Sequence, residues 1–502
     1  MNFAPTQFAL LFLLSCAAAQ AGSGTWLTNP IDNNWSNPAN WSSGTVPSTL
    51  DIATFEFSAI DAISVASSGG VGGILFNPGA SSYTFTNESS NGFTFRGSIV
   101  NNSGIPQNFV LASDGSGTVP YFSLFGIFGA ETAIVGSMVT FTVHAPGVID
   151  FGSYYSAGEG TIIAEAATIA GQQPGVISFA YNHTTAGDST IINRGATVSG
   201  AEGGHTYFAQ QTPTAGNATI IAEGGSNGGG GGAVIIYDLT TGETARIEVF
   251  GNGYADISQL DIGSFSIGSL EGSGLMFLGR KDLSIGGNNL STEFSGIMQD
   301  GGIVNEAGAS IKKVGAGTLT LTGANTYTGG TTVDGGQLVV ENSSGSATGT
   351  AVVLVKSGML GGDGIIFGPV TVGTGSGSGA FLAPAHGTSR QATLTIQGAL
   401  TLNSDATFSY TLKAKRNRLN GDKVISNGVA ISRGATFDLS GSIRGKLVPG
   451  TVLSVISNTS AAAIAGAFNN LPDGGLVHVN GNNLQANYEG GDGNDLTLTV
   501  VP

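Results

Sequence analysis

Polar and apolar residues alternate in short runs along most of this chain, and glycines separate the runs. In the clearest example, 314–344, the run 318–322 places leucines on one side of a strand and threonines on the other. The alternation breaks at 323–325, resumes over 327–333, and meets Gly335-Gly336, which predicts a second turn. Strands this short are marginal alone. We therefore expect a stack of similar units that share one apolar column.

A 29-residue repeat supports this stack. Three eight-residue segments share the pattern small-Ala-Gly-x-x-Thr-Ile-Ile and begin at Ser156, Thr185 and Thr214. A weaker copy begins at Thr241. Each repeat holds about three short strands with glycine turns, which fits a coil of a β-helix better than a four-stranded propeller blade. We predict an all-β fold, a right-handed parallel β-helix (β-solenoid) with an N-terminal cap. The glycine-rich run 224–232 predicts a loop that protrudes from one coil.

The chain has three tryptophans, Trp26, Trp35 and Trp41, and all lie near its start. The end of a solenoid exposes unpaired backbone groups, so this cluster predicts a compact cap over the first coil. A platform for stacking sugars is the alternative interpretation. The segment 71–87 follows and predicts two strands across an Asn-Pro-Gly turn.

Composition changes the picture in two ways. The chain has 82 glycines and 10% charged residues, yet 40% of its residues are hydrophobic, which favours a packed solenoid over disorder. Its net charge of −16 argues against nucleic acid as a partner and is unfavourable for anionic lipid surfaces. The single basic cluster contains Lys413, Lys415, Arg416 and Arg418. We interpret it as a solvated turn, with a phosphate or acidic-glycan contact as the alternative.

The first residues, 1–21, predict a secretory signal peptide. An apolar run at 8–19 precedes Ala19-Gln20-Ala21, which fits a cleavage site, although no Lys or Arg precedes that run. Cys16 is the chain's single cysteine, and its surroundings also resemble a lipoprotein box, which would make it a lipidated anchor. Cleavage after Ala21 would leave a mature chain without cysteine, which needs no disulfides.

The central run resembles the autotransporter-associated β-strand repeat, whose pattern runs roughly G-x-G-T-L-x-L-x-G-x-N-T-Y-x-G. The positions that match are Gly315, Gly317, Thr318, Leu319, Leu321, Gly323, Asn325, Thr326, Tyr327, Gly329, Thr331, Gly336 and Leu338. The resemblance implies a pectin-lyase-like right-handed β-helix exported by a Gram-negative-type cell, with a surface or adhesive role. Two departures stand out: there is one strong copy of the repeat, and we find no series of ten-residue strands that would predict a translocating barrel of its own.

These patterns divide the chain into five expected parts. They are a signal peptide at 1–21, a Trp-rich cap and first coils at 22–100, solenoid coils with the 29-residue repeat at 101–310, the autotransporter-associated repeat at 311–344, and C-terminal coils with a terminal cap at 345–502. Leu319, Leu321 and Leu338 are expected as core rungs, and Asn325 and Tyr327 as turn and stacking positions.

Catalytic chemistry has little support in the sequence. A polysaccharide lyase or glycoside hydrolase on a β-helix would need clustered carboxylates, with Ca²⁺ and an Arg or Lys base in a lyase. The charged residues Arg194, Arg280, Lys281 and Asp282 are isolated, and we expect them at the surface or in turns. The histidines show no metal-ligand spacing; they are His144, His183, His205, His386 and His478.

One motif resembles the start of a calcium-binding nonapeptide: 490–495, with Asp492 and Asp495. Leucines in the following strand shift its register, and only one copy is present. We therefore expect a turn that leads into a terminal strand, and we predict no catalytic, cofactor-binding or metal-binding residues.

The sequence predicts a secreted or cell-surface structural or adhesin-like rod without catalysis. Its expected partners are glycans or other cell-surface components; its oligomeric state is not predicted. The alternatives are a polysaccharide lyase or glycoside hydrolase on the same fold, and a lipid-anchored outer-membrane component.

Overall fold

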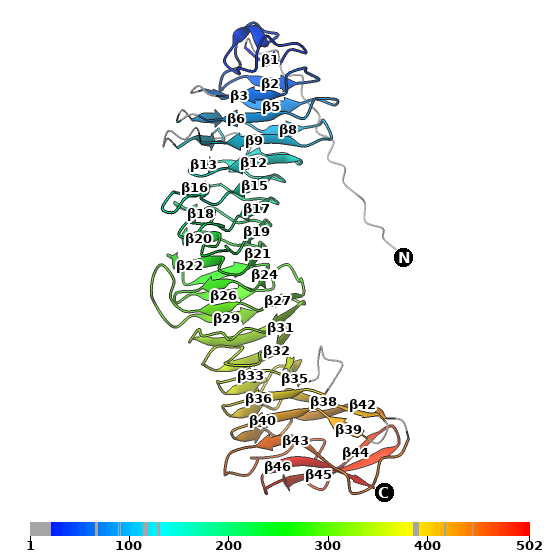
Figure 1. Ribbon diagram of the computed structural model, residues 1–502. Helices are drawn as coiled ribbons and strands as arrows, with labels where there is room; N and C mark the ends of the chain where they lie inside the picture. The colour runs from blue at the N-terminus through cyan, green and yellow to red at the C-terminus, as the bar shows by residue number, and fades with distance from the viewer. Residues whose placement is uncertain are drawn as a thin grey trace.

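The computed structural model describes residues 22–65, 69–88, 90, 92–113, 119–127, 131–384, 391–415, 418–443 and 445–502. They form a long rod of stacked coils, with the first coils at one end and the last strands at the other (Figure 1). Most neighbouring strands pair in parallel, which confirms the predicted β-solenoid. The helical content of these residues is one 3-10 turn, η1 (Pro38–Asn40). None of their helices has the length and apolar character needed to cross a lipid bilayer.

Two long sheets lie on opposite sides of the rod (Figure 1). One of them, called here the ten-stranded sheet, carries the candidate site described below. Its strands, in order along the chain, are β4 (Gly69–Val71), β7 (Phe93–Phe95), β10 (Tyr121–Leu124), β13 (Val148–Phe151), β16 (Val176–Ala180), β18 (His205–Ala209), β20 (Ala233–Asp238), β22 (Tyr254–Leu260), β25 (Leu275–Phe277) and β28 (Ile297–Gln299).

The other long sheet runs almost the full length of the rod. Its strands are β3 (Ala62–Ser64), β6 (Thr84–Asn87), β9 (Gln107–Leu111), β12 (Val139–Val143), β15 (Thr161–Ala164), β17 (Thr190–Asn193), β19 (Thr219–Ala222), β21 (Arg246–Val249), β23 (Ser264–Ile267), β24 (Ser269–Gly272), β26 (Asp282–Ile285), β27 (Thr292–Phe294), β29 (Ser310–Lys313), β30 (Thr318–Leu321), β31 (Gly330–Val340), β32 (Val353–Gly362), β34 (Val370–Val372), β35 (Ala380–Ala383), β37 (Leu400–Leu402), β38 (Ala406–Lys415), β39 (Arg418–Gly421), β41 (Val429–Ile431) and β42 (Thr436–Ile443).

Smaller sheets complete the coils and close the C-terminal end. A four-stranded sheet contains β1 (Gly24–Thr25), β2 (Ile52–Phe55), β5 (Gly73–Phe76) and β8 (Ile99–Asn101), and β11 (Ala133–Ile134) pairs with β14 (Tyr155–Ser156). The C-terminal sheet contains β33 (Ile365–Ile366), β36 (Thr393–Ile396), β40 (Lys423–Ser426), β43 (Val452–Asn458), β44 (Leu476–Val479), β45 (Asn482–Gly490) and β46 (Asp495–Val501). Its last strands pair antiparallel. The expected strands of 71–87 are β5 and β6; they do not form a hairpin, because each pairs in a different sheet.

The 29-residue repeat is one coil of the solenoid. Thr161 pairs with Thr190, and Thr190 with Thr219, in parallel register. Single bridges also join Ser156 to Thr185 and continue to Thr214 and Thr241. Equivalent residues of successive repeats therefore stack directly on one another, as the sequence predicts.

Inward-facing positions repeat in the same register and build the core. The rings of Phe151, Phe179 and Phe208 stack with centroids 4.8 Å apart, and all three side chains are fully buried. This distance matches the spacing between neighbouring strands. Each coil thus adds one layer to a continuous apolar column.

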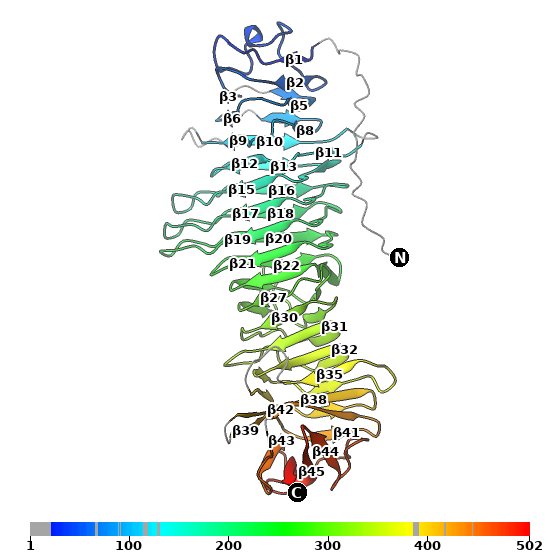
Figure 2. The same cartoon turned by 90° about the vertical axis from the view of Figure 1, so that its right-hand side faces the viewer.

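The loop 224–232 protrudes from its coil as predicted, but it is not isolated. It stacks on the loop of the preceding coil, where Ala196 N–H donates to Gly230 O at 2.8 Å and Gly230 N–H donates to Ala201 O at 2.8 Å. Figure 2 shows these loops projecting from one edge of the rod. Backbones pack so closely here that a Cβ on Gly229 would lie 2.3 Å from Ala196 O, which explains the glycine content.

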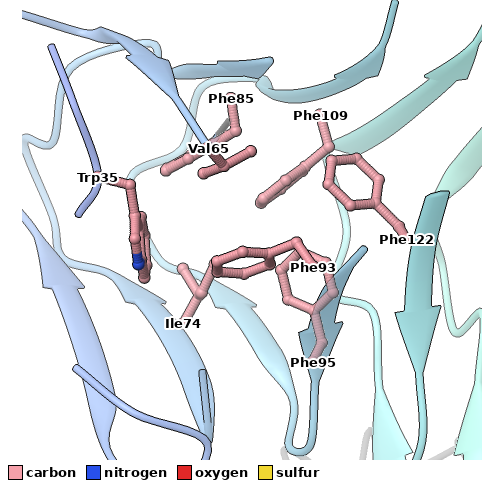
Figure 3. Close-up of a pocket in the computed structure, with 8 residues that line it drawn as sticks. All are labelled: Trp35, Val65, Ile74, Phe85, Phe93, Phe95, Phe109 and Phe122. Carbon is pink, nitrogen blue, oxygen red and sulfur yellow. The ribbon is translucent and has the colours of Figure 1, made fainter. Parts of the chain in front are cut away.

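The three tryptophans are buried at the N-terminal end of the rod. The ring centroid of Trp41 lies 5.2 Å from that of Trp26 and 4.8 Å from that of Trp35, in edge-to-face contacts. The interior beneath them is apolar, as Figure 3 shows for Trp35, Val65, Ile74, Phe85, Phe93, Phe95, Phe109 and Phe122. Buried rings offer no open face to a sugar, so this arrangement fits a cap rather than a stacking platform.

The central repeat differs from its expected form at one place. The turn expected at Gly335-Gly336 is a corner within β31, whose first part pairs with β29 and whose second part pairs with β30. Asn325 and Tyr327 lie between β30 and β31, and both are buried. Leu319, Leu321 and Leu338 lie in the core, as predicted.

Asn325 connects three successive coils through its side chain. Its Oδ1 accepts from Met298 N–H at 2.7 Å, and its Nδ2 donates to Ala347 O at 2.6 Å. Tyr327 contributes apolar bulk, and its hydroxyl lies 2.6 Å from Thr331 Oγ1. The polar residues of this motif therefore satisfy buried groups of neighbouring coils.

Candidate binding surface

Aromatic residues gather on the outer face of the ten-stranded sheet, where β18, β20 and β22 lie side by side. In β18, Thr206 and Phe208 point inward and are buried, so the alternation turns His205 and Tyr207 outward. Tyr237 on β20 and Tyr254 on β22 join them. We call His205, Tyr207, Tyr237 and Tyr254 the tyrosine cluster.

The register of the strands brings these side chains together. His205 pairs with Ala233, and Ala233 with Tyr254, so a small residue separates the two rings along the rod. A register shift between β20 and β22, at Ile235/Tyr237, changes the position of Tyr237 relative to its neighbours. The ring centroids of Tyr207 and Tyr237 lie 6.2 Å apart.

Hydrogen bonding and burial keep the cluster uncharged near neutral pH. His205 Nδ1 lies 2.9 Å from Tyr207 Oη. Burial lowers the pKa of His205, against the opposing charge of Glu202. Burial, together with Tyr237, Tyr254 and Glu202, raises the pKa of Tyr207 to about 12. The pKa values of Tyr237 and Tyr254 are also raised, first by burial and then by the charge of Asp256. The phenols are therefore neutral and can both donate and accept hydrogen bonds.

Asp256 lies two residues after Tyr254 on β22, and its carboxylate is held by hydrogen bonds within the protein. Its side chain is 1% exposed, and its two oxygens accept from Ser258 N–H and Ile303 N–H, each at 2.8 Å. The segment 300–308 thus folds back over β22, where Val304 N–H also donates to Ser258 Oγ at 3.0 Å. Asp256 fixes this segment and its oxygens are not open to a ligand.

The arrangement suits recognition of hydroxyl-rich ligands. Tyrosine combines an apolar ring face with a polar tip, so three neighbouring phenols can stack against one part of a ligand and hydrogen-bond another. Among the described residues, no three His, Cys, Asp or Glu side chains come together as a metal site would require. The exposed carboxylate at the edge of the cluster is that of Glu202.

The isolated charged residues make pairwise contacts. Arg194 contacts Glu223 at 2.6 Å, Arg280 contacts Glu306 at 3.1 Å, and Asp282 Oδ1 accepts from Ser310 Oγ at 2.5 Å. Lys281 closes a turn, where its N–H donates to Leu278 O at 3.0 Å, but its side chain is buried and 7% exposed. Its Nζ donates to Leu260 O at 2.5 Å, so a backbone carbonyl compensates for the burial of the amine.

The histidines are dispersed. His205 belongs to the tyrosine cluster, His183 stacks on Tyr154, and His478 Nδ1 lies 2.7 Å from Asn483 Oδ1. His144 lies at a corner where its carbonyl accepts from Gly147 N–H, and His386 lies outside the described residues.

The remaining predicted features occupy turns or undescribed segments. Lys415 on β38 pairs with Arg418 on β39 in an antiparallel hairpin, which also carries Lys413; Arg416 lies outside the described residues. Likewise, the structure does not describe Cys16.

The calcium-like segment 490–495 forms the turn between β45 and β46, as expected. Asp492 is exposed in it. Asp495 Oδ1 accepts from Asn458 N–H at 2.8 Å, which fixes the turn to a neighbouring strand. These backbone contacts account for the turn, and its lack of calcium stays a prediction.

Sequence reasoning missed the tyrosine cluster. A signal was present, because the 29-residue period places Tyr207 directly after Ser178 in one outward column. Following that column through the coils would have predicted an outward Tyr207. The same column would not have predicted the position of Tyr237, because the repeat in the sequence does not reveal the register shift beside this residue.

Comparisons with known proteins agree with the fold. Residues 311–340 match the family model described as passenger-associated-transport-repeat. A segment of 104 residues is 36% identical to the adhesin BmaC autotransporter of Brucella suis biovar 1 (strain 1330). That match covers 21% of this chain and 3% of the length of the relative. Together with the solenoid, these findings fit an autotransporter passenger domain and confirm the resemblance.

Proposed function

We propose, from a chain that carries a passenger-associated-transport-repeat on a β-solenoid, that this protein is an adhesin-like rod without catalysis. It is secreted or held on the outer surface of a Gram-negative-type bacterium. There it presents a rigid repetitive surface to glycans or other cell-surface components. The relative named as an adhesin supports this role, and the observation that carries it is the tyrosine cluster on a fixed sheet.

The solenoid prepares the cluster for binding. Its strands are paired on both sides, so the Cα positions of Tyr207, Tyr237 and Tyr254 are set before a ligand arrives. Tyrosine has few rotatable bonds, and side chains that are already ordered lose little entropy on binding. Such a surface gives each contact a modest affinity. Many copies on one cell would add to avidity.

The charge around the cluster limits its partners. The nearby carboxylates include those of Glu202, Asp238 and Asp256, and the whole chain carries a net charge of −16. Neutral hydroxyl-rich groups can approach without repulsion, whereas strongly anionic polymers are disfavoured. Glycans with uncharged sugars fit this surface best.

Adhesion of beads coated with the full chain tests the proposal. The beads are applied to glycan arrays and to cultured cells, and retention under flow is counted. We expect Tyr207→Ala combined with Tyr254→Ala to reduce retention about thirtyfold, because each of the two aromatic contacts contributes about 1 kcal/mol. Tyr121→Ala is the matched control, since Tyr121 is an outward tyrosine of the same sheet and is 42% exposed. Absence of retention on every surface, or equal loss in the control, would refute the proposal.

A further inference from the structure

A second group of aromatic side chains lies where the chain leaves the ten-stranded sheet, after β10, β13 and β16. We call Phe125, Tyr154, Tyr181 and His183 the aromatic corner. Tyr181 is 37% exposed and His183 is exposed, while Phe125 and Tyr154 are half-buried. Exposed apolar residues that are scattered singly need no explanation, whereas several aromatic side chains gathered at one corner mark a candidate binding surface.

The rings of the aromatic corner are arranged along the axis of the rod. Tyr154 and His183 occupy equivalent positions of successive coils, and their rings stack with centroids 4.8 Å apart and planes 20° apart. Phe125 and Tyr181 lie 6.5 Å apart, on either side of the coil between them. That coil carries Gly152, where a Cβ would lie 1.9 Å from the Phe125 ring. The glycine lets the Phe125 ring lie flat against the backbone.

The backbone at this corner adopts a conformation that large residues normally avoid. Tyr154, Tyr181 and His183 have φ values of 60°, 73° and 60°. The same coils turn at a second corner, after the bridge at Ser156 and its equivalents, in the same left-handed conformation. That corner uses glycine in three successive coils, at Gly158, Gly187 and Gly216, and Glu243 with a φ of 46° in the fourth.

The contrast between the two corners is informative. Glycine adopts the left-handed conformation without steric cost, whereas a residue with a Cβ is strained there. In the coils that carry the aromatic corner, the second corner places glycine in the left-handed conformation and avoids the strain. The aromatic corner retains large side chains in that conformation despite the strain. Strain of this kind is typical of sites where the side chain serves a ligand.

Polar groups that suit a neutral ligand surround the rings. Asn182 is exposed, and its Oδ1 accepts from Thr212 Oγ1 at 2.9 Å. Gln211 is exposed one coil further along. The segments 152–155, 181–184 and 210–213 contain no Asp, Glu, Lys or Arg. Amides next to aromatic faces can bind sugar hydroxyls while the rings cover the apolar face of the sugar.

We propose that the aromatic corner is a binding site for a neutral oligosaccharide that lies along the solenoid axis. One sugar ring packs against Tyr181 and the next against the stacked pair of Tyr154 and His183. Asn182 and Gln211 hydrogen-bond the hydroxyl groups. The site deepens the proposed function and rests on it, because it names the glycan class that such a rod would recognise.

The test measures binding of soluble oligosaccharides to the full chain by calorimetry. The probes are hexamers of β-linked glucose, xylose and mannose, with oligogalacturonate of equal length as the anionic comparison. We expect at least one neutral hexamer to bind and oligogalacturonate to bind at least tenfold more weakly. Failure of every neutral hexamer at millimolar concentration, or tighter binding of oligogalacturonate, would overturn the inference.

Glycine variants separate binding from structure. Tyr181→Gly combined with His183→Gly removes the rings and relieves the backbone, so we expect binding at least tenfold weaker with Tm unchanged or raised. Unchanged binding in this variant overturns the inference, and so does a Tm that falls by many degrees while binding persists, because the rings would then serve packing alone.

The tyrosine cluster provides the complementary control. Tyr207→Ala should leave binding of the hexamers at the aromatic corner unchanged, while bead adhesion falls. Hexamer binding without adhesion would refute the proposed function and leave the binding site intact. Adhesion that depends on Tyr207 without any hexamer binding would support the proposed function and refute the binding site at the aromatic corner.

Discussion

Replacing Asn325 with alanine should loosen three coils at once. The side chain is 2% exposed and satisfies two backbone groups, Met298 N–H at 2.7 Å and Ala347 O at 2.6 Å. Alanine removes both side-chain hydrogen-bonding groups and leaves the N–H of Met298 and the carbonyl of Ala347 without these partners. A buried unsatisfied group costs about 1–3 kcal/mol, so the two together cost about 2–6 kcal/mol.

The effect should be local, because a solenoid coil contacts only its neighbours. Hydrogen–deuterium exchange read by mass spectrometry is therefore the informative assay. We expect the amide of Met298, and the peptide that contains it, to exchange at least tenfold faster in Asn325→Ala. A loss of about 1.4 kcal/mol of local stability raises the population of the open state about tenfold. Urea unfolding followed by circular dichroism should show an earlier transition.

Thr326→Ala is the matched control, since Thr326 is exposed and adjacent in sequence. Surface substitutions of this kind usually change stability by less than about 0.5 kcal/mol. If Asn325→Ala exchanged at the same rate as Thr326→Ala around Met298, the bridge between coils would not be stabilising. The reasoning from buried hydrogen bonds would then be wrong.

Three further predictions concern other parts of the rod. Lys313 is 1% exposed and burial lowers its pKa to about 8. The unfolded Lys313 therefore holds more protons than the folded one from about pH 8 to the ordinary value of 10.5, and its contribution to stability should rise with pH across that window by up to about 3 kcal/mol. Buried tyrosines with raised pKa values favour unfolding as pH approaches 10 in the parent and the variant alike, so the measurement is the difference in urea midpoint between the parent and Lys313→Met, which should shift in favour of the parent from pH 7.5 to 9. Gly286→Ala should cost about 2 kcal/mol or more, since its Cβ would lie 1.9 Å from a backbone oxygen of the next coil. Gly308→Ala, with positive φ but open space, should cost less in the same thermal melts. Trp35→Ala should destabilise the cap by about 3–5 kcal/mol, whereas Ile31→Ala, at a position 73% exposed, should leave the melt unchanged.

The fold can be predicted from the sequence where the sequence repeats with a fixed period. The 29-residue period, with the same turn and strand residues in each copy, leaves little freedom, because a shift by one position would turn Ile162, Ile191 and Ile220 out of the core. The coils after Asp256 have unequal lengths, and their alternation predicts strands but not partners.

Side chains at corners are where sequence reasoning fails. Asn325 follows Gly323-Ala324 and resembles a turn residue, and its burial depends on the neighbouring coils that its side chain contacts. Lys281 is charged, yet it is buried, and a backbone carbonyl of another coil accepts a hydrogen bond from its Nζ. These outcomes depend on partners that are distant in sequence. The same holds for the tyrosine cluster, where alternation predicts the outward face of each strand and not the neighbours across the sheet.

The segment held over β22 has a mechanical consequence. A rod pulled from its ends unravels coil by coil, and each step breaks one set of strand contacts. Asp256 and Ile303 are 47 residues apart in the chain, and their hydrogen bond joins coils that the strand ladders alone would release one at a time. The carboxylate of Asp256 therefore ties this part of the rod across two coils, and a cell tethered by such a rod in flow would load that tie before these coils separate.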